Sequence, residues 1–185
     1  MIGWDLPTSA VIGGKTYQLH ADFRDVLEIF QYLDDPQLPE YLRWQIALAL
    51  FFEEKIPEQY QQEAMEYLSA FITCGREERK RPGPRLLDWE QDAPMIVADV
   101  NKAAGQEIRA LPFLHWWTFL SWFNAIGQGQ LSTVVSIREK LQTGKKLDKW
   151  ERDFYRENKT LVDMKKRYSP QELEEQARLK KLLGE

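Results

Sequence analysis

The sequence of 185 residues has little from which a reactive centre is built: one cysteine, Cys74, and two histidines, His20 and His115. A single cysteine excludes an intramolecular disulfide and a multi-cysteine zinc site. The two histidines are far apart and belong to no His-x-x-x-His or calcium-loop pattern, so we expect neither a metal ion nor a cofactor. Because nothing near Cys74 favours a cysteine–histidine nucleophile and no glycine-rich phosphate loop occurs, we expect no catalytic residue.

Long hydrophobic runs are also missing. The longest, residues 46–52 and 114–123, fall short of the roughly 20 apolar residues that span a bilayer, and no signal peptide is visible. The net charge of −4 argues against a general nucleic-acid binder. The basic stretch at residues 76–85 contains no aromatic side chain for base stacking, so we interpret it as a solvated loop. We therefore expect no contact with membranes or nucleic acid.

What the first part of the sequence does contain is one hairpin pattern followed by helical periodicity. Gly13 and Gly14 between two short alternating segments predict a two-residue β-turn. Asp22, Pro39 and Pro57 stand at the starts of segments whose apolar residues recur at three- and four-residue steps. The helices predicted here cover residues 23–33, 39–54 and 57–72. Their short joints favour an antiparallel arrangement.

The rest of the chain continues the helical pattern. Gly105 and Gly144 are expected to end helices, Ser132 to cap one, and Ser169 and Glu172 to form a capping box. The helices predicted here cover residues 93–104, 112–127, 132–141, 148–168 and 170–183. The whole pattern predicts a mainly α protein, a multi-helix bundle of about seven helices with a small N-terminal β-hairpin.

We divide the chain into four parts. Residues 1–75 hold the hairpin and the first three helices, and residues 76–87 form a basic exposed linker with two prolines. Residues 88–168 form an aromatic-rich helical region that packs on the first part. Residues 169–185 form a C-terminal helix with few apolar side chains, which we expect at the periphery.

An acidic cluster of Asp88, Glu90 and Asp92 precedes one predicted helix. Such carboxylates are compatible with glycosidase or nuclease chemistry. Carboxylates near the start of a helix are ordinarily residues that compensate the helix dipole, and we favour this interpretation. For His115, within an aromatic segment, we expect a packed and hydrogen-bonded imidazole rather than a catalytic one.

Two aromatic blocks stand in a fixed order along the chain. Leu114-His115-Trp116-Trp117-x-Phe119 is followed by Phe154-Tyr155-Arg156-x-x-Lys159-x-Leu161, and Asp88-Trp89-Glu90-Gln91-Asp92-Ala93 precedes both. The ordered set resembles a bacteriophage tail-protein family named after "gene product fifteen", from siphophages and prophages of Gram-positive bacteria. Genes of this family lie between the tail-tube and tape-measure genes. This chain departs from the family pattern at residues 132–137 and keeps only Arg138 of it, so no role is assigned there.

The resemblance implies a function in phage tail morphogenesis. It implies a non-enzymatic tail-assembly chaperone that binds the tape-measure protein in the host bacterial cytoplasm, with the tail-tube protein as a further partner. Helices 148–168 and 170–183 are candidates for self-association. We expect Trp117, Phe119 and Trp122 to contact the partner and Trp116 and Phe123 to lie in the core. Two alternatives stay open: a structural component of the mature tail, and an uncharacterised enzyme that uses the acidic cluster with His115.

Overall fold

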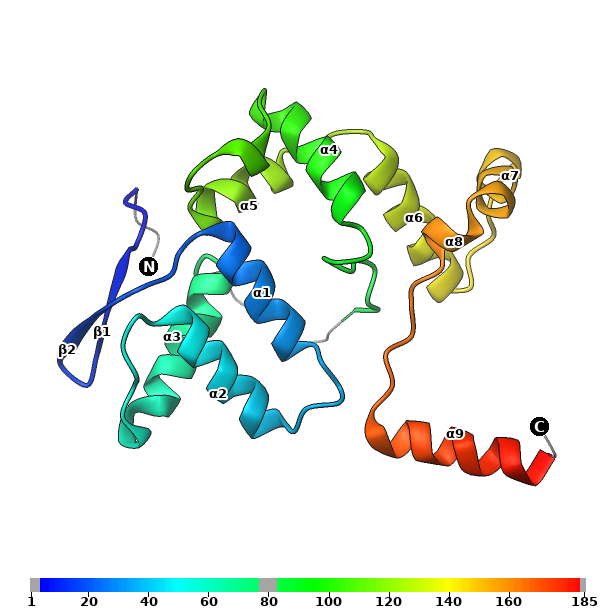
Figure 1. The fold of residues 1–185 in the computed structure, drawn as a ribbon. Helices are drawn as coiled ribbons and strands as arrows, with labels where there is room; N and C mark the ends of the chain where they lie inside the picture. The colour runs from blue at the N-terminus through cyan, green and yellow to red at the C-terminus, as the bar shows by residue number, and fades with distance from the viewer. Residues whose placement is uncertain (1–3, 77–82, 184–185) are drawn as a thin grey trace. The chain divides into compact units, whose positions relative to one another are not determined.

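The computed structural model describes residues 4–76 and 83–183, which form two units (Figure 1). The hairpin unit contains residues 7–72 and 166–183, and the aromatic unit contains residues 73–165 with the segment 4–6. The described residues form nine α-helices and one two-stranded sheet, which confirms the prediction of a mainly α fold with an N-terminal hairpin. Each unit is built as follows.

The hairpin forms where the two glycines predict it. Strands β1 (Ser9–Ile12) and β2 (Lys15–Gln18) pair antiparallel around Gly13 and Gly14, whose φ angles are 56° and 79°. Positive φ at both central residues is what a type I′ turn requires. A Cβ at Gly13 would also come within 2.5 Å of the ring of Tyr60, so a larger residue here requires that ring to move and glycine is favoured.

Three helices complete the core of the hairpin unit. They are α1 (Phe23–Leu33), α2 (Glu40–Phe51) and α3 (Gln61–Ile72), the last preceded by a 3-10 turn, η1 (Glu58–Tyr60). Asp22 caps α1 as predicted, because its Oδ1 accepts the N–H of Arg24 at 2.9 Å. α1 packs on α2 and α2 on α3. Fully buried apolar side chains from all three helices form the core: Val26, Ile29, Phe51 and Leu68.

Helix α2 ends at Phe51, three residues before its predicted end. Phe52 is extended and forms an isolated antiparallel bridge with Leu19, and the N–H of Glu53 donates to the carbonyl of Gln18 at 3.1 Å. The chain therefore leaves the helix to pair with the segment at β2. A lone hairpin is marginal in water, and this pairing gives β2 a second neighbour.

The aromatic unit contains five helices. They are α4 (Ala93–Ala104), α5 (Trp116–Asn124), α6 (Gln130–Gln142), α7 (Lys149–Glu157) and α8 (Lys159–Val162), with a 3-10 turn, η2 (Ile108–Ala110), after α4. α4 packs on α5 and α6, and α6 packs on α8. α4 ends at Gly105 with φ of 69°, as the sequence predicts.

Two helix starts differ from the predictions. α5 begins at Trp116 rather than at residue 112, because His115 is its N-cap. α6 begins at Gln130, two residues before the predicted cap. Ser132 lies in the first turn instead, where its hydroxyl accepts the N–H of Gly129 at 2.9 Å. A carboxylate of α4, Asp99, accepts the N–H of Leu131 at 3.3 Å, so a residue distant in sequence helps to define this helix start.

Helix α9 (Pro170–Leu183) begins with the predicted capping box. The N–H of Ser169 donates to Glu172 Oε2 at 2.7 Å, and the N–H of Glu172 donates to Ser169 Oγ at 3.3 Å. Hydrogen bonds from Ser169 lower the pKa of the Glu172 carboxyl. No helix in the described ranges has the length and hydropathy needed to cross a membrane.

The predicted linker at residues 76–87 falls mostly on residues 77–82, which lie outside the described residues. Gly83, Pro84 and Arg85 are exposed. Leu86 and Leu87 are half-buried instead. The exposed linker therefore ends before Leu86, where the chain joins the buried network of the aromatic unit.

Candidate functional site

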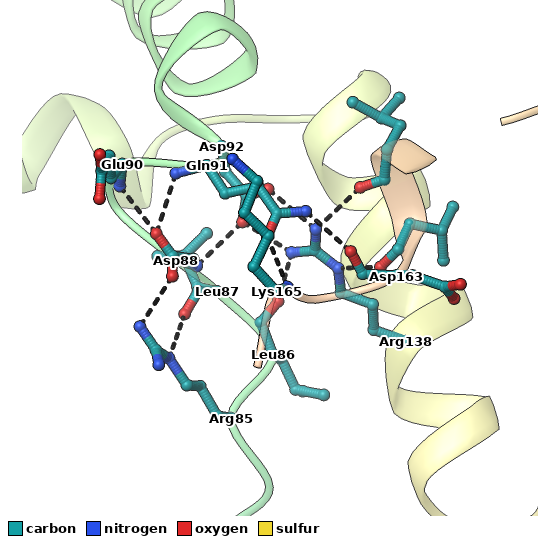
Figure 2. Close-up of polar contacts among 12 residues, drawn as sticks. Arg85, Leu86, Leu87, Asp88, Glu90, Gln91, Asp92, Arg138, Asp163 and Lys165 are labelled. Atoms are coloured by element: carbon teal, nitrogen blue, oxygen red, sulfur yellow. Dashed lines mark hydrogen bonds and ion pairs between the residues drawn. The ribbon is translucent and has the colours of Figure 1, made fainter. Parts of the chain in front are cut away.

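A buried arginine organises the aromatic unit. Arg138 on α6 is 3% exposed and donates five hydrogen bonds (Figure 2). Two go to Asp92, from Nη1 to Oδ2 at 2.6 Å and from Nη2 to Oδ1 at 2.9 Å. The others go to backbone carbonyls: Nε to Val162 at 2.7 Å, Nη1 to Leu86 at 3.0 Å and Nη2 to Leu161 at 2.9 Å.

This arrangement uses the full donor capacity of the side chain. A guanidinium has five N–H donors in a fixed planar fork, and every one of them meets an acceptor here. The two bonds to Asp92 form a bidentate ion pair, the strongest geometry for such a pair. We call Arg138 and its four acceptor residues, Asp92, Leu86, Leu161 and Val162, the Arg138 network. It joins three segments that are far apart in sequence.

The acidic cluster belongs to this network rather than to a solvated helix start. Asp92 is 0% exposed, and its Oδ2 also accepts the N–H of Asp88 at 2.9 Å. Asp88 is buried as well. Its Oδ1 accepts the N–H groups of Glu90 and Gln91, and its Oδ2 accepts Nη2 of Arg85 at 2.9 Å. Both carboxylates lie at the start of α4, where the sequence interpretation placed them, but the side chain of Asp92 caps no N–H of this helix and pairs with Arg138 instead.

The predicted single helix at residues 148–168 is also wrong: it is interrupted at Asn158, between α7 and α8, and it ends at Val162, where the Arg138 network gives the reason. A helix that continued past α8 would bond the N–H of Lys165 to the carbonyl of Leu161. That carbonyl instead accepts Arg138, and the N–H of Lys165 donates to Oε1 of Gln91 at 2.9 Å. Gln91 also donates from Nε2 to the carbonyl of Asp163 at 2.8 Å. Tertiary hydrogen bonds thus replace those of the helix.

A cluster of four aromatic rings lies in the same unit. Trp116 and Phe119 stack with ring centroids 5.5 Å apart, and Phe119 and Phe123 stack at 6.3 Å. Trp89 contacts all three, at 6.0 Å from Trp116, 6.3 Å from Phe119 and 5.1 Å from Phe123. Aromatic pairs at these separations contribute stability beyond their buried area. The acidic-aromatic segment that precedes α4 therefore supplies both a carboxylate to Arg138 and a ring to this cluster.

Of the residues expected to contact a partner, one is in the core. Phe119, which we expected to contact a partner, is 1% exposed and packs within the ring cluster, where it offers no surface for that contact. Trp117 and Trp122 are half-buried and keep part of their surface in water. Trp116 is buried, as predicted for a core residue, while Phe123 is only half-buried.

One exposed aromatic side chain, Phe113, lies next to the aromatic helix α5. It precedes α5 and is 53% exposed. The centroid of its ring lies 6.5 Å from that of the His115 ring. The His115 ring centroid lies 6.0 Å from the ring centroid of Trp117. The rings of Phe113 and Trp117 thus each lie near the buried His115. We call these two residues the Phe113–Trp117 edge.

The remaining candidate residues do not form a reaction centre with one another in the described structure. Glu90 is exposed, whereas the oxygens of Asp88 and Asp92 already accept arginine and backbone N–H groups. Cys74 is half-buried with a positive φ of 53°, and burial raises the pKa of its thiol. Within residues 4–76 and 83–183, no three His, Cys, Asp or Glu side chains are grouped for a metal ion.

Comparison with protein families finds a match over most of this chain. The model of the family described as "Bacteriophage Gp15 protein" matches residues 4–164, which is most of the chain. This chain belongs to that family. The match contains the Arg138 network, the ring cluster and the Phe113–Trp117 edge, whereas α9 follows its end. No curated protein and no solved structure gives a significant match.

Arg138 is the residue of this family member that the sequence interpretation missed. A signal for it exists in the sequence. Leu131, Val134 and Arg138 follow one another at three- and four-residue steps, so the arginine occupies a position of the buried face of α6. A charged residue is almost never fully buried without a partner, so the sequence predicts that Arg138 pairs with a buried acidic residue. The identity of that partner is not predictable from spacing.

His115 has a structural part in this arrangement that is open to test. Its Nδ1 accepts the N–H of Trp117 at 3.1 Å, which caps α5. Replacing His115 with alanine should lower the free energy of unfolding of the aromatic unit by about 1–2 kcal/mol, through the lost cap. His115→Asn should retain most of this stability, since asparagine is a preferred N-cap. Urea denaturation of both variants checks this, and equal losses for Ala and Asn would contradict the capping role.

Proposed function

We propose that this phage protein is a tail-assembly chaperone, which acts in the host bacterial cytoplasm by binding the tape-measure protein and catalyses no reaction. The observation that carries the proposal is the Phe113–Trp117 edge. It presents an exposed and a half-exposed aromatic side chain next to a helix whose other face is fixed in the core. Membership of the Gp15 family supports a role in the phage. The gene order that the resemblance implies supports the tape measure as client.

The chemistry required of such a chaperone is modest. A tape-measure protein presents long amphipathic helices with apolar stripes, which need cover until tube subunits assemble around them. Aromatic side chains on a rigid element cover such a stripe with large contact area and little loss of conformational freedom. The ring cluster holds α5 in place, so Trp117 is positioned before the client arrives.

The acidic cluster supports a binding role over an enzymatic one. A general acid or base must reach the proton that it transfers. Asp88 and Asp92 are buried, and each is held by an arginine and by backbone N–H groups. These carboxylates therefore serve the architecture of the aromatic unit. The same architecture presents the Phe113–Trp117 edge.

Binding to the tape-measure protein encoded nearby is the direct test. The chain should co-purify with a tagged tape-measure protein when both are expressed together. The double variant Phe113→Ala with Trp117→Ala should raise the dissociation constant about 30-fold, which corresponds to a loss of about 2 kcal/mol of binding free energy. Tyr41→Ala is the matched control, because Tyr41 is an exposed aromatic residue of the hairpin unit. Unchanged binding by the double variant, or equal loss in the control, would remove the edge as the binding surface.

The composition of purified virions separates the chaperone from a structural tail component. A chaperone is released when the tube subunits assemble, so this protein should be absent from mature particles and present in extracts of infected cells. Its presence in virions at a fixed ratio to the tube protein would overturn the chaperone assignment. Binding to the tail-tube protein, measured in the same co-purification, tests the second expected partner.

A further inference from the structure

An apolar cleft lies along helix α2 in the hairpin unit. Its volume is about 440 Å³, within the range of about 300–1,000 Å³ that is usual for binding pockets. Leu48, Phe52 and Ile56 line it and are at most 7% exposed, so these side chains form its floor. The exposed residues of its lining form the rim. They are Gln45, Ala49, Glu53, Lys55 and Glu58. We call this feature the α2 cleft.

The α2 cleft is elongated, because its lining follows one face of the helix. At 100° per residue, Gln45, Leu48 and Ala49 fall within an arc of about 100°. Phe52 continues this row at the end of α2, and the row from Gln45 to Phe52 is about 10 Å long. Two turns of a second helix have the same length. An amphipathic helix can therefore place two apolar side chains, one turn apart, on this floor.

The end of α2 makes the cleft electronegative. α2 ends at Phe51 without a basic residue in its last turn, and Glu53 follows two residues later. A carboxylate at the C-terminus of a helix adds to the negative end of the helix dipole, which is the opposite of the usual compensation. The neighbouring carboxylate of Glu54 is paired with Lys15. In the part of the chain that the structure describes, Glu53 belongs to no such ion pair.

A backbone carbonyl at the same helix end adds to the negative charge. In a helix that continued past Phe51, the N–H of Glu53 would donate to the carbonyl of Ala49. That N–H donates instead to the carbonyl of Gln18, at 3.1 Å. Ala49 and Glu53 both line the cleft. Its rim therefore combines a carboxylate with the carbonyl end of a helix, and both attract a cation.

We propose that the α2 cleft binds a basic amphipathic helix of a partner protein. Apolar side chains of the partner cover the floor, and a lysine or arginine beside them binds the carboxylate of Glu53. Charge selects this occupant, because the lining holds two carboxylates, Glu53 and Glu58, against one ammonium group, Lys55. An acidic helix would bring like charges to the end of α2. The proposal goes beyond the chaperone function, since the cleft lies in the hairpin unit and the Phe113–Trp117 edge in the aromatic unit.

Binding of synthetic helical peptides to the full chain tests the proposal. The first peptide has about 18 residues, with leucines at three- and four-residue steps on one face and lysines beside them. In the second peptide, glutamate replaces every lysine. The third contains the residues of the first in a scrambled order that forms no apolar face. Fluorescence anisotropy should show the first peptide binding at least about tenfold more tightly than either of the others.

Two variants locate this binding at the α2 cleft. Glu53→Gln should raise the dissociation constant of the lysine peptide about fivefold, through the loss of one exposed ion pair. Ala49→Leu should raise it about tenfold, because the larger side chain obstructs the cleft. The matched controls are Glu66→Gln and Ala70→Leu, at exposed positions of α3 outside the lining of the cleft. Both should stay within about twofold of the wild type.

Thermal melts distinguish lost binding from lost folding. Glu53→Gln removes a charge that the dipole of α2 repels, so its melting temperature should equal or exceed that of the wild type. Equal binding of the lysine peptide and the scrambled peptide would indicate charge attraction alone and would overturn the proposal. So would undetectable binding of the lysine peptide, or losses in the controls that equal those in Glu53→Gln and Ala49→Leu.

Discussion

Replacing Arg138 with methionine is expected to lower the free energy of unfolding of the aromatic unit by about 3–5 kcal/mol. The substitution leaves Asp92, which is fully buried, as an uncompensated charge, and it removes the donor from three buried or half-buried carbonyl groups. Urea denaturation followed by tryptophan fluorescence measures this change. Trp44 is the one tryptophan of the hairpin unit, so the signal reports mainly on the aromatic unit.

Arg156→Met is the matched control for this prediction. Arg156 lies on α7 with an exposed side chain, and its guanidinium is 3.1 Å from Asp153. Such surface ion pairs contribute little, so the control should change stability by less than about 0.5 kcal/mol. A loss below about 1 kcal/mol for Arg138→Met would contradict the stabilising role of the network.

A double variant separates the ion pair from the carbonyl contacts. Replacing Asp92 with leucine together with Arg138→Met removes both buried charges, which by itself is often neutral or stabilising. The carbonyls of Leu86, Leu161 and Val162 still lose their donor. We therefore expect the double variant to remain less stable than the wild type, although more stable than Arg138→Met alone.

Truncating the ring cluster should have an effect of similar size. Trp116→Ala and Phe119→Ala each leave a large cavity among rings that contact one another at 5–7 Å, and each should cost about 3–5 kcal/mol. Thermal melts and urea denaturation of the single variants measure the losses. The prediction for Phe119 follows from its burial, since a surface residue at this position would cost little.

Trp117→Ala and Trp122→Ala are the controls for the ring cluster. Both side chains are half-buried, so each truncation should cost about 1 kcal/mol and leave the fold intact. Trp117→Ala should then reduce tape-measure binding without a matching loss of stability. If all four variants lost stability equally and binding followed stability alone, α5 would be entirely core and would not be a binding surface.

The sequence by itself determined the elements whose signals are local. Gly13 and Gly14 specify their turn by their own freedom to adopt positive φ, and Gly105 ends α4 in the same way. Asp22 and the Ser169–Glu172 box satisfy N–H groups within three residues of themselves. Such signals act through neighbours along the chain, so residue type and spacing are sufficient to recognise them.

The candidate site was only partly predictable, because some of its features depend on contacts that are not local in the sequence. The aromatic segment and the acidic cluster stood out by composition, and the burial of Trp116 followed from helical periodicity. The exposure of Phe113 and the burial of Phe119 did not follow, because both depend on where α5 begins. That start is set by the cap from His115, a residue type that is not among the preferred N-caps.

Only the tertiary structure decided the role of Arg138 and the end of α8. Arg138 meets Asp92 across 46 residues and Leu86 across 52, and Gln91 meets Lys165 across 74. Local propensity at residues 159–168 favours a continuous helix by only a few tenths of a kcal/mol per residue. Charge-assisted hydrogen bonds in a buried site contribute more than that, so they take the carbonyls of Leu161 and Val162 from the helix. Contacts of this kind produce no recognisable residue spacing in the sequence, because their partners are brought together only by folding.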